Sequence, residues 1–169
     1  LMYKLNQTGR AAIVLPDGFL FGEGAKTAIK EKLLDEFNLH TIIRLPNGVF
    51  APYTGINTNL LFLERGKTKE VWFYEHQLPE GYKNYTKTKP IKHDEFNAEK
   101  EWWDNRTETD CAWKVSINEI KERNYNLDFK NPATTLENEL LEPSSIINKI
   151  SQHLGNSIQI LKEIEEIMK

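Results

Sequence analysis

The residues best suited to chemistry lie in the loop 45–59, which reads LPNGVFAPYTGINTN. Its prolines, glycines and asparagines predict an irregular loop, and the apolar runs on either side, 41–45 and 60–63, are typical of strands. The loop also carries two aromatic residues, Phe50 and Tyr53, which a purely connecting segment does not need. Because long connections that display their own apolar side chains are often functional, this loop is the first candidate site.

Small and polar groups accompany these aromatic rings. Thr54, Gly55 and Asn57 offer hydroxyl and amide groups that could contact a phosphate, although turn chemistry is the interpretation that we favour for most of them. We expect Gly55 to allow a positive φ or the close approach of another segment. Asp17 follows the apolar run 11–16, where α/β sheets place functional groups, and it is equally suited to be a turn or capping residue.

A basic stretch with interleaved aromatic residues follows later in the chain. It contains Tyr82, Tyr85, His93 and four lysines: Lys83, Lys87, Lys89 and Lys92. Lysines position a protein on phosphate groups without reading sequence. A solvated lysine-rich loop explains the stretch equally well, so both interpretations stay open. The histidines and the single Cys111 lack metal-ligand spacing, and we predict no metal site.

The elements that must position these residues are predicted from hydrophobic periodicity. We expect strands at 11–16, 39–45, 59–63 and 71–74 and a helix over 25–37 whose apolar face repeats at Ala25, Ile29, Leu33 and Phe37. Strand, helix and strand form a βαβ unit with a right-handed crossover. The run 11–16 is continuously apolar, as in a strand covered on both faces. The strand 59–63 returns without a helix, which predicts antiparallel pairing, and 71–74 is expected at the sheet edge.

The composition changes near residue 79, which predicts an extended strap over 79–143 anchored by buried aromatic residues such as Trp102, Trp103 and Trp113. Ser116 is placed to cap a helix, and 113–117 and 125–129 alternate like short strands. From Pro143 onward the pattern changes to a long helix over 144–169 with a heptad stripe. The stripe residues that we expect to dock on a partner helix are Ile147, Ile150, Leu154, Leu161 and Ile164. We therefore expect three parts in the chain: an α/β sheet over 1–78, the extended strap over 79–143 and the helix over 144–169.

The length, composition and net charge of the chain limit the class of protein. The chain has 169 residues, 39% of them hydrophobic, with a mean hydropathy of −0.58. A net charge of −3 argues against coating nucleic acid by charge alone, but leaves a local basic patch open. One cysteine fits a reducing compartment, and no stretch has the pattern of a membrane span or signal peptide. We expect a soluble, cytoplasmic protein, and a chain that opens inside a helix at Leu1 and is part of a longer one.

Several stretches resemble the methylase (M) subunit of type I restriction–modification systems. The first three are 16–21 (PDGFLF), 42–50 (IIRLPNGVF) and 54–59 (TGINTN). Three later ones resemble the C-terminal part of the same subunit: 83–90 (KNYTKTKP), 112–116 (AWKVS) and 124–128 (NYNLD). The resemblance runs in order over nearly the whole chain, so the chain looks like the C-terminal portion of an M subunit. It implies an α/β fold, the C-terminal part of a Rossmann-like methyltransferase sheet.

The resemblance implies transfer of a methyl group from S-adenosylmethionine to N6 of adenine in DNA. The family's adenine-pocket motif is an Asn-Pro-Pro-aromatic tetrapeptide, which this sequence lacks, because Asn131-Pro132 is followed by Ala133. It also lacks a glycine-rich strand end suited to the cofactor. We therefore expect S-adenosylmethionine to bind only the full-length subunit, no cofactor to bind this fragment, and no catalytic residue within it. A free-standing small-molecule methyltransferase is disfavoured for the same reason.

The resemblance also implies a role for the candidate loop. Methylating an adenine within a duplex requires extruding the base, and an aromatic ring can replace its lost stacking. Phe50 matches the family position of that ring, and Tyr53 is the second candidate. On the residues alone we favour inward packing of Phe50, whereas the resemblance favours stacking.

The implied partners are DNA, a specificity (S) subunit and a restriction (R) subunit. The helix 144–169 would dock on the S subunit, or else pack back on its own subunit or pair with a second copy. Two functions follow: part of a site-specific adenine-N6 DNA methyltransferase, or a non-catalytic interaction module that assembles with a specificity subunit.

Overall fold

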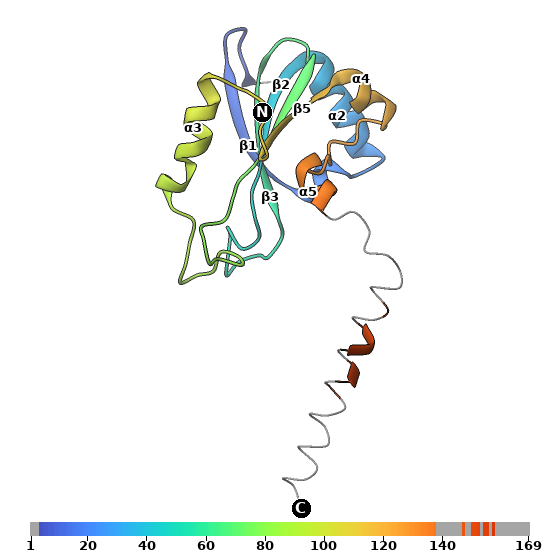
Figure 1. Cartoon of the computed structure of the whole chain (residues 1–169). Coiled ribbons are helices and arrows are strands. Elements are labelled where there is room, and N and C mark those ends of the chain that lie inside the picture. Colours follow the sequence, from blue (N-terminus) through green and yellow to red (C-terminus); the bar gives the residue numbers. More distant parts are fainter. Residues whose placement is uncertain (1–3, 138–146, 148–149, 153, 156, 158–169) are drawn as a thin grey trace, which may run out of the picture. The chain divides into compact units, whose positions relative to one another are not determined.

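The computed structural model describes residues 4–137 together with 147, 150–152, 154, 155 and 157. The chain forms two compact units, Leu1–Ala133 and Thr134–Lys169. The first holds one mixed five-stranded sheet (Figure 1). Its strands are β1 (Arg10–Pro16), β2 (Phe37–Arg44), β3 (Thr58–Arg65), β4 (Glu70–Glu75) and β5 (Ala112–Ser116). The helices are α1 (Asp17–Leu20), α2 (Ala25–Glu36), the 3-10 helix η2 (His93–Phe96), α3 (Asn97–Asp104), α4 (Ile117–Glu122) and α5 (Pro132–Glu137).

The strand order β1-β3-β2-β4-β5 sets three carboxyl ends on one edge of the sheet. Strand β3 lies between β1 and β2 and is antiparallel to both, which confirms the pairing expected for the return without a helix. Strand β4 is parallel to β2. It follows that β1, β2 and β4 run in the same direction and end at the same edge. The strand–helix–strand unit is confirmed, and the handedness of its crossover stays a prediction.

Two predictions about the strands are wrong. We expected β4 at the sheet edge, but β5 pairs antiparallel with it. The apolar residues of β4 point to both faces, since Val71, Phe73 and Tyr74 are all buried. We also expected β1 to be covered on both faces, but its residues alternate in burial and Val14 is 46% exposed. Only the face that packs on the main core is covered among the described residues.

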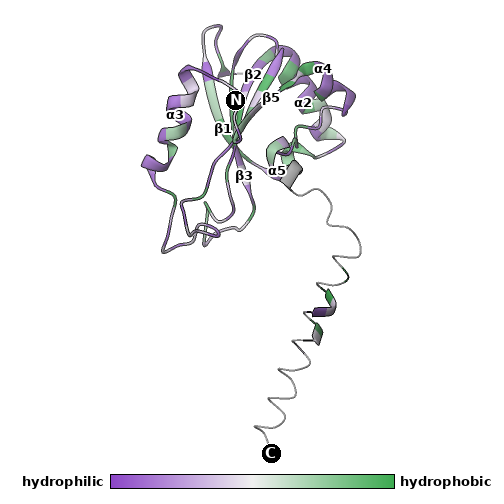
Figure 2. Ribbon diagram, in the orientation of Figure 1, coloured by the Kyte–Doolittle hydropathy of each residue, from purple (hydrophilic) through white to green (hydrophobic). Residues whose placement is uncertain are grey.

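Each face of the sheet has its own hydrophobic core. On one face, β2–β5 pack against α1, α2 and α4 through residues such as Leu34, Phe73 and Ile120. The other face packs against α3 through Trp102 and its neighbours. In Figure 1, α3 lies on one side of the sheet, and α2 and α4 lie on the other. Hydrophilic and hydrophobic segments alternate along α3 in Figure 2, as expected for a helix with one buried face.

Helix α2 forms where it was predicted, but its buried face differs from the prediction. Ile29 is 50% exposed, whereas Lys30 is buried beside Leu33 and Leu34. The Lys30 ammonium group donates to Leu20 O at 2.7 Å and to Gly22 O at 2.9 Å. These carbonyls at the end of α1 satisfy a charge that a helical pattern places on the surface. Burial lowers the pKa of Lys30, and the charge of Lys26 adds to this effect.

Residues 79–133 contain more regular structure than the extended strap that we expected. Strand β5 joins the sheet, so the sheet continues beyond the boundary at residue 78. The predicted aromatic anchors are confirmed for Trp102 and Trp113, which are buried, whereas Trp103 is only partly buried. The Ser116 cap is also confirmed, since Ser116 Oγ accepts from Glu119 N at 3.3 Å. The chain at 125–129 forms no strand. The three-part division of the chain stays a prediction.

The long helix expected over 144–169 lies largely outside the described residues, whereas the short opening helix lies only partly outside them, and residues 5–9 form no helix. Of the helix 144–169, the residues that the structure describes are helical, and they include Ile147, Ile150 and Leu154. Leu161 and Ile164 lie outside the described residues, as do residues 1–3. Within the described part of the chain, no helix has the length and apolar character needed to cross a membrane.

Candidate functional site

Polar side chains gather where the parallel strands end. Asp17 follows β1, Arg44 is the last residue of β2, and Glu75 and His76 end and follow β4. The loop 46–57 leaves β2 at the same edge and returns as β3. Open α/β sheets bind ligands outside the carboxyl ends of their strands. The topology therefore brings the two predicted features, Asp17 and the loop, to one edge.

Arg44 is the centre of this edge. Its Nη1 donates to Asp128 Oδ1 and to Phe129 O, each at 2.8 Å, and its Nη2 lies 3.8 Å from Asp17 Oδ1. Asp17 Oδ1 also accepts from Asn59 Nδ2 at 2.7 Å. Burial acts to raise the pKa of Asp128, but the hydrogen bonds from Arg44 and Lys130 outweigh it and lower that pKa. Arg44 thus ties β1, β2 and the segment after α4 together.

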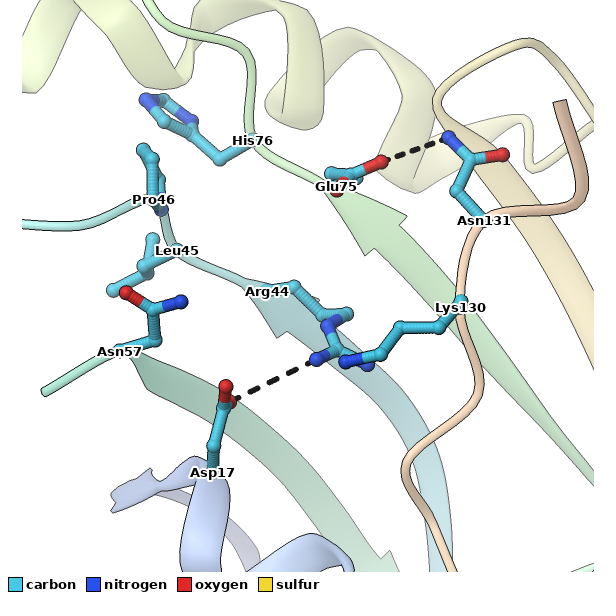
Figure 3. Close-up of a pocket in the computed structure, with 9 residues that line it drawn as sticks. All are labelled: Asp17, Arg44, Leu45, Pro46, Asn57, Glu75, His76, Lys130 and Asn131. Atoms are coloured by element: carbon cyan, nitrogen blue, oxygen red, sulfur yellow. Dashed lines mark hydrogen bonds and ion pairs between the residues drawn. The ribbon is translucent and has the colours of Figure 1, made fainter. Parts of the chain in front are cut away.

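A polar pocket of about 200 Å³ lies beside Arg44 (Figure 3). Two of its lining side chains are bonded to each other, since Asn131 Nδ2 donates to Glu75 Oε2 at 2.8 Å (Figure 3). The residues that line it come from the start of α1, the end of β2, the loop, the end of β4 with the residue after it, and the segment 130–131: Asp17, Arg44, Leu45, Pro46, Asn57, Glu75, His76, Lys130 and Asn131. Its lining offers both hydrogen-bond donors and acceptors, with two acidic side chains, Asp17 and Glu75, and two basic ones, Arg44 and Lys130.

The candidate loop is a series of turns that displays its aromatic residues. Ala51 N donates to Gly48 O, and Tyr53 N and Thr54 N both donate to Phe50 O. Phe50 is 40% exposed and Tyr53 is 92% exposed. The interpretation that Phe50 packs inward, favoured on the residues alone, is therefore wrong for this structure. Whether either ring stacks on a base stays a prediction.

The residues predicted to support the loop and its pocket are Asp17, Thr54, Gly55 and Asn57, and the structure places them differently. Asp17 and Asn57 line the pocket, and Asp17 N donates to Asn57 O at 3.0 Å. Thr54 Oγ1 accepts from Ile56 N at 3.1 Å, which is turn chemistry. The prediction for Gly55 is wrong, because it has no positive φ and the nearest atom to a Cβ there would be 4.0 Å away. Gly48 has those properties instead, with a φ of 84° and a Cβ position 2.0 Å from Tyr85 O.

The predicted DNA-backbone lysines, Lys83, Lys87 and Lys89, are exposed, and Lys89 Nζ lies 4.9 Å from the centre of the Tyr82 ring. Their role stays a prediction. The docking residues Ile147, Ile150 and Leu154 are likewise exposed. Among the described residues, no group of three or more His, Cys, Asp and Glu side chains could hold a metal ion.

Sequence reasoning missed Arg44, Asp128, His76 and Tyr85 as parts of this region. Arg44 left one signal, because it is the charged residue in an otherwise apolar strand end, Ile42-Ile43-Arg44-Leu45. A charge there needs a partner. Its partners lie 84 and 85 residues away, and no local pattern identifies them.

Comparison with known proteins shows the class to which this fold belongs. Residues 1–140 match the sequence profile of the family described as N-6 DNA Methylase. The Escherichia coli "Type I restriction enzyme EcoEI methylase subunit" is 62% identical over 136 residues, which is 76% of this chain and 28% of that protein. The chain therefore belongs to the N-6 DNA methylase family, whose members are S-adenosylmethionine-dependent methyltransferases.

Solved structures narrow the class further. A modification subunit of a putative type I restriction enzyme from Vibrio vulnificus YJ016 is 50% identical, with a TM-score of 0.73 over 78% of this chain and 29% of that chain. A chain from a structural study of type I R-M complex assembly and conformational transition is 35% identical, with a TM-score of 0.74 over 98% of this chain and 37% of that chain. Within the family, this chain corresponds to part of the methylase (M) subunit of a type I restriction–modification system. It spans less than a third of the EcoEI subunit's length.

Proposed function

We propose that this chain supplies the target-base loop of a site-specific adenine-N6 DNA methyltransferase subunit. The observation that carries the proposal is the exposed Phe50 ring, on a loop that leaves the carboxyl edge of the sheet. An extruded adenine loses its stacking neighbours, and a displayed aromatic ring can replace one of them at about 1 to 3 kcal/mol. The polar pocket beside Arg44 lies at the same edge and would support the loop.

The described residues do not fit S-adenosylmethionine. Strands β2 and β4 end in Arg44-Leu45 and Glu75-His76 without the glycine-rich turn that lets a backbone approach a nucleotide-like cofactor. Glycines do follow β1, but α1 separates Gly22 and Gly24 from the strand, and Thr27 stands where the G-x-G-x-x-G pattern needs its third glycine. Cofactor binding and the transfer step are therefore assigned to the remainder of the longer subunit. The role proposed for this chain is to hold the base and to contribute to assembly.

The test is to replace Phe50 in the full-length subunit, assembled with its partners. Phe50→Ala is expected to lower kcat/KM for DNA methylation by about 5- to 150-fold, because base stacking worth about 1 to 3 kcal/mol is lost. Phe50→Trp should retain most of the activity, since it keeps an aromatic face. Ile56→Ala, an exposed apolar side chain on the same loop, is the control. Methylation unchanged by Phe50→Ala would show that the loop does not act on the base.

A second function, a non-catalytic interaction module, is favoured by the exposed apolar side chains of Ile147, Ile150 and Leu154. A helix with such a stripe gains stability by docking on a partner helix, and a specificity (S) subunit would be that partner. Two variants separate the functions. If deleting residues 144–169 abolished assembly while Phe50→Ala left methylation intact, the interaction role alone would stand. DNA and the restriction (R) subunit complete the proposed partners.

The lysines of the basic stretch are proposed to contact the DNA backbone. Replacing Lys83, Lys87 and Lys89 together by glutamine is expected to weaken DNA binding for every sequence alike and to reduce the slope of log affinity against log salt by about 2 to 3. Fluorescence anisotropy over a salt series measures this. Glutamine at Lys67 and Lys69, exposed lysines between β3 and β4 at the opposite edge, is the control. Equal slopes for both variants would show that the lysines of the basic stretch do not contact the DNA backbone.

A further inference from the structure

Tyr85 is buried in an otherwise exposed, lysine-rich stretch, and the start of the candidate loop rests on its backbone. Tyr85 N donates to Asn47 O at 3.0 Å. A Cβ added at Gly48 would lie 2.0 Å from Tyr85 O and 2.8 Å from Tyr85 C, so only glycine lets the two segments approach this closely. The close approach joins segments that are nearly 40 residues apart in the chain.

The Tyr85 side chain is held by a buried polar network. Its hydroxyl donates to Glu95 Oε2, which leaves the hydroxyl oxygen to accept from His76 Nε2 at 3.1 Å. His76 Nδ1 in turn contacts Glu99 Oε1. Burial, followed by the hydrogen bond to Glu95, raises the pKa of Tyr85, so the phenol keeps the proton that it donates. Each of these four side chains has at least one partner in the network, which holds the Tyr85 ring in place, while the second oxygen of Glu99, Oε2, is buried without a hydrogen-bond partner among the described residues.

The network connects the loop to three elements of the fold. His76 follows β4, and its backbone N donates to Arg44 O at 3.0 Å. Glu95 lies in η2 and Glu99 in α3. Tyr85 therefore transmits the position of the sheet edge and of α3 to the first turn of the loop. Two residues after Gly48, the chain reaches Phe50.

We propose that Tyr85 is a positioning residue for Phe50, because its buried hydroxyl network fixes the backbone on which Asn47 and Gly48 rest. This inference rests on the proposed function of the loop. The turns that follow Gly48 are local, since Ala51 N donates to Gly48 O at 2.9 Å and Tyr53 N donates to Phe50 O at 2.9 Å. Because they are built outward from Gly48, a shift at Gly48 moves the Phe50 ring as a unit with the loop.

The test compares Tyr85→Phe with Tyr82→Phe in the full-length subunit. Each variant removes one phenol hydroxyl from the same stretch and keeps the ring. Tyr82→Phe leaves the ring under Lys89 and is the matched control. Tyr85→Phe is expected to lower kcat for methylation about tenfold, with KM for DNA nearly unchanged. The contacts that bind DNA are retained, but the Phe50 ring is less often in the position in which it stacks on the extruded base. With 2-aminopurine at the target base, the fluorescence rise on extrusion should be smaller.

Hydrogen exchange gives a second readout that does not depend on catalysis. In Tyr85→Phe the amides of residues 47–54 should exchange about tenfold faster, whereas those of β2 and β3 should keep their rates. Gly48→Ala should give the same local change and a larger loss of kcat. Unchanged exchange at 47–54 in both variants would overturn the positioning role.

The two proposals fail in different ways. If Phe50→Ala lowers methylation but Tyr85→Phe alters neither kcat nor loop exchange, the positioning role is wrong and the loop function stands. If Tyr85→Phe accelerates loop exchange while Phe50→Ala leaves methylation unchanged, Tyr85 positions a loop that does not act on the base, and the proposed function is wrong. Faster exchange throughout the sheet in Tyr85→Phe would show that Tyr85 stabilises the whole fold and not the loop in particular, which would overturn the proposal.

Discussion

Replacing Arg44 with methionine is expected to lower the free energy of unfolding by about 3 kcal/mol at neutral pH, because it removes the cation of a largely buried charge cluster. Among the described residues, Asp128 then keeps only the exposed Lys130 as a cationic partner, and Asp17 keeps only the Asn59 amide. Arg44 is 11% exposed at its side chain and holds Asp128 at 2.8 Å and Asp17 at 3.8 Å. The variant also leaves Phe129 O without its donor. Urea unfolding of the wild-type and variant chains measures the difference.

The matched control for this prediction is Lys114→Met. Lys114 Nζ lies 3.6 Å from Glu70 Oε2, but both side chains are about half exposed. Exposed ion pairs contribute only about 0 to 1 kcal/mol because water and salt screen them. A loss as small for Arg44→Met as for Lys114→Met would show that the Arg44 cluster does not stabilise the sheet edge.

The contribution of Arg44 should also depend on pH in a defined direction. The pKa of Asp128 is lowered from 3.8 in the folded state, so its ionised form is favoured by folding. The stabilisation is therefore complete above pH 3.8 and is lost as the pH falls through the folded-state pKa. The difference between wild type and Arg44→Met should shrink over the same interval. A difference that stayed constant into that acid range would exclude Asp128 as the partner that matters.

Local patterns in the sequence were sufficient to predict the elements but not their neighbours. The strands around 11–16, 39–45 and 59–63 and the cap at Ser116 depend on residues close in sequence, which periodicity and capping rules describe. The edge position assigned to β4 was wrong because β5 arrives from about 40 residues later. The burial of Lys30 does not follow from the helical pattern for a related reason, since its two carbonyl partners, Leu20 O and Gly22 O, lie at and just after the end of α1.

The candidate site shows the same limit at finer scale. The loop contains two glycines, and the sequence favoured Gly55 as the one with a special conformation. Which glycine needs a special conformation depends on which one lies against another segment, and the Tyr85 backbone packs against Gly48. Likewise, the aromatic rings of the loop could be recognised from their types, but their exposure depends on how the loop is anchored. Contacts between distant segments therefore decide the parts of the site that the sequence left open.

Replacing Phe73 with alanine is expected to lower the free energy of unfolding by about 3 to 5 kcal/mol, the range for deleting a buried phenylalanine side chain. Phe73 is fully buried on β4. Its ring stacks on Trp113 with centroids 5.5 Å apart and lies 5.6 Å from the Phe129 ring. The cavity would therefore open between β4, β5 and the segment whose Asp128 and Phe129 O hold Arg44.

The control for Phe73 is Phe21→Ala, which makes the same chemical change at a ring that is 52% exposed. Surface substitutions usually change stability by no more than about 0.5 kcal/mol. Because Phe129 contacts both Phe73 and Arg44, Phe73→Ala and Arg44→Met should be non-additive in the double variant, as expected for neighbours that share a partner. Urea midpoints for the four proteins of that cycle measure the coupling. Strict additivity would mean that the core beneath β4 and the charge cluster at the sheet edge are independent.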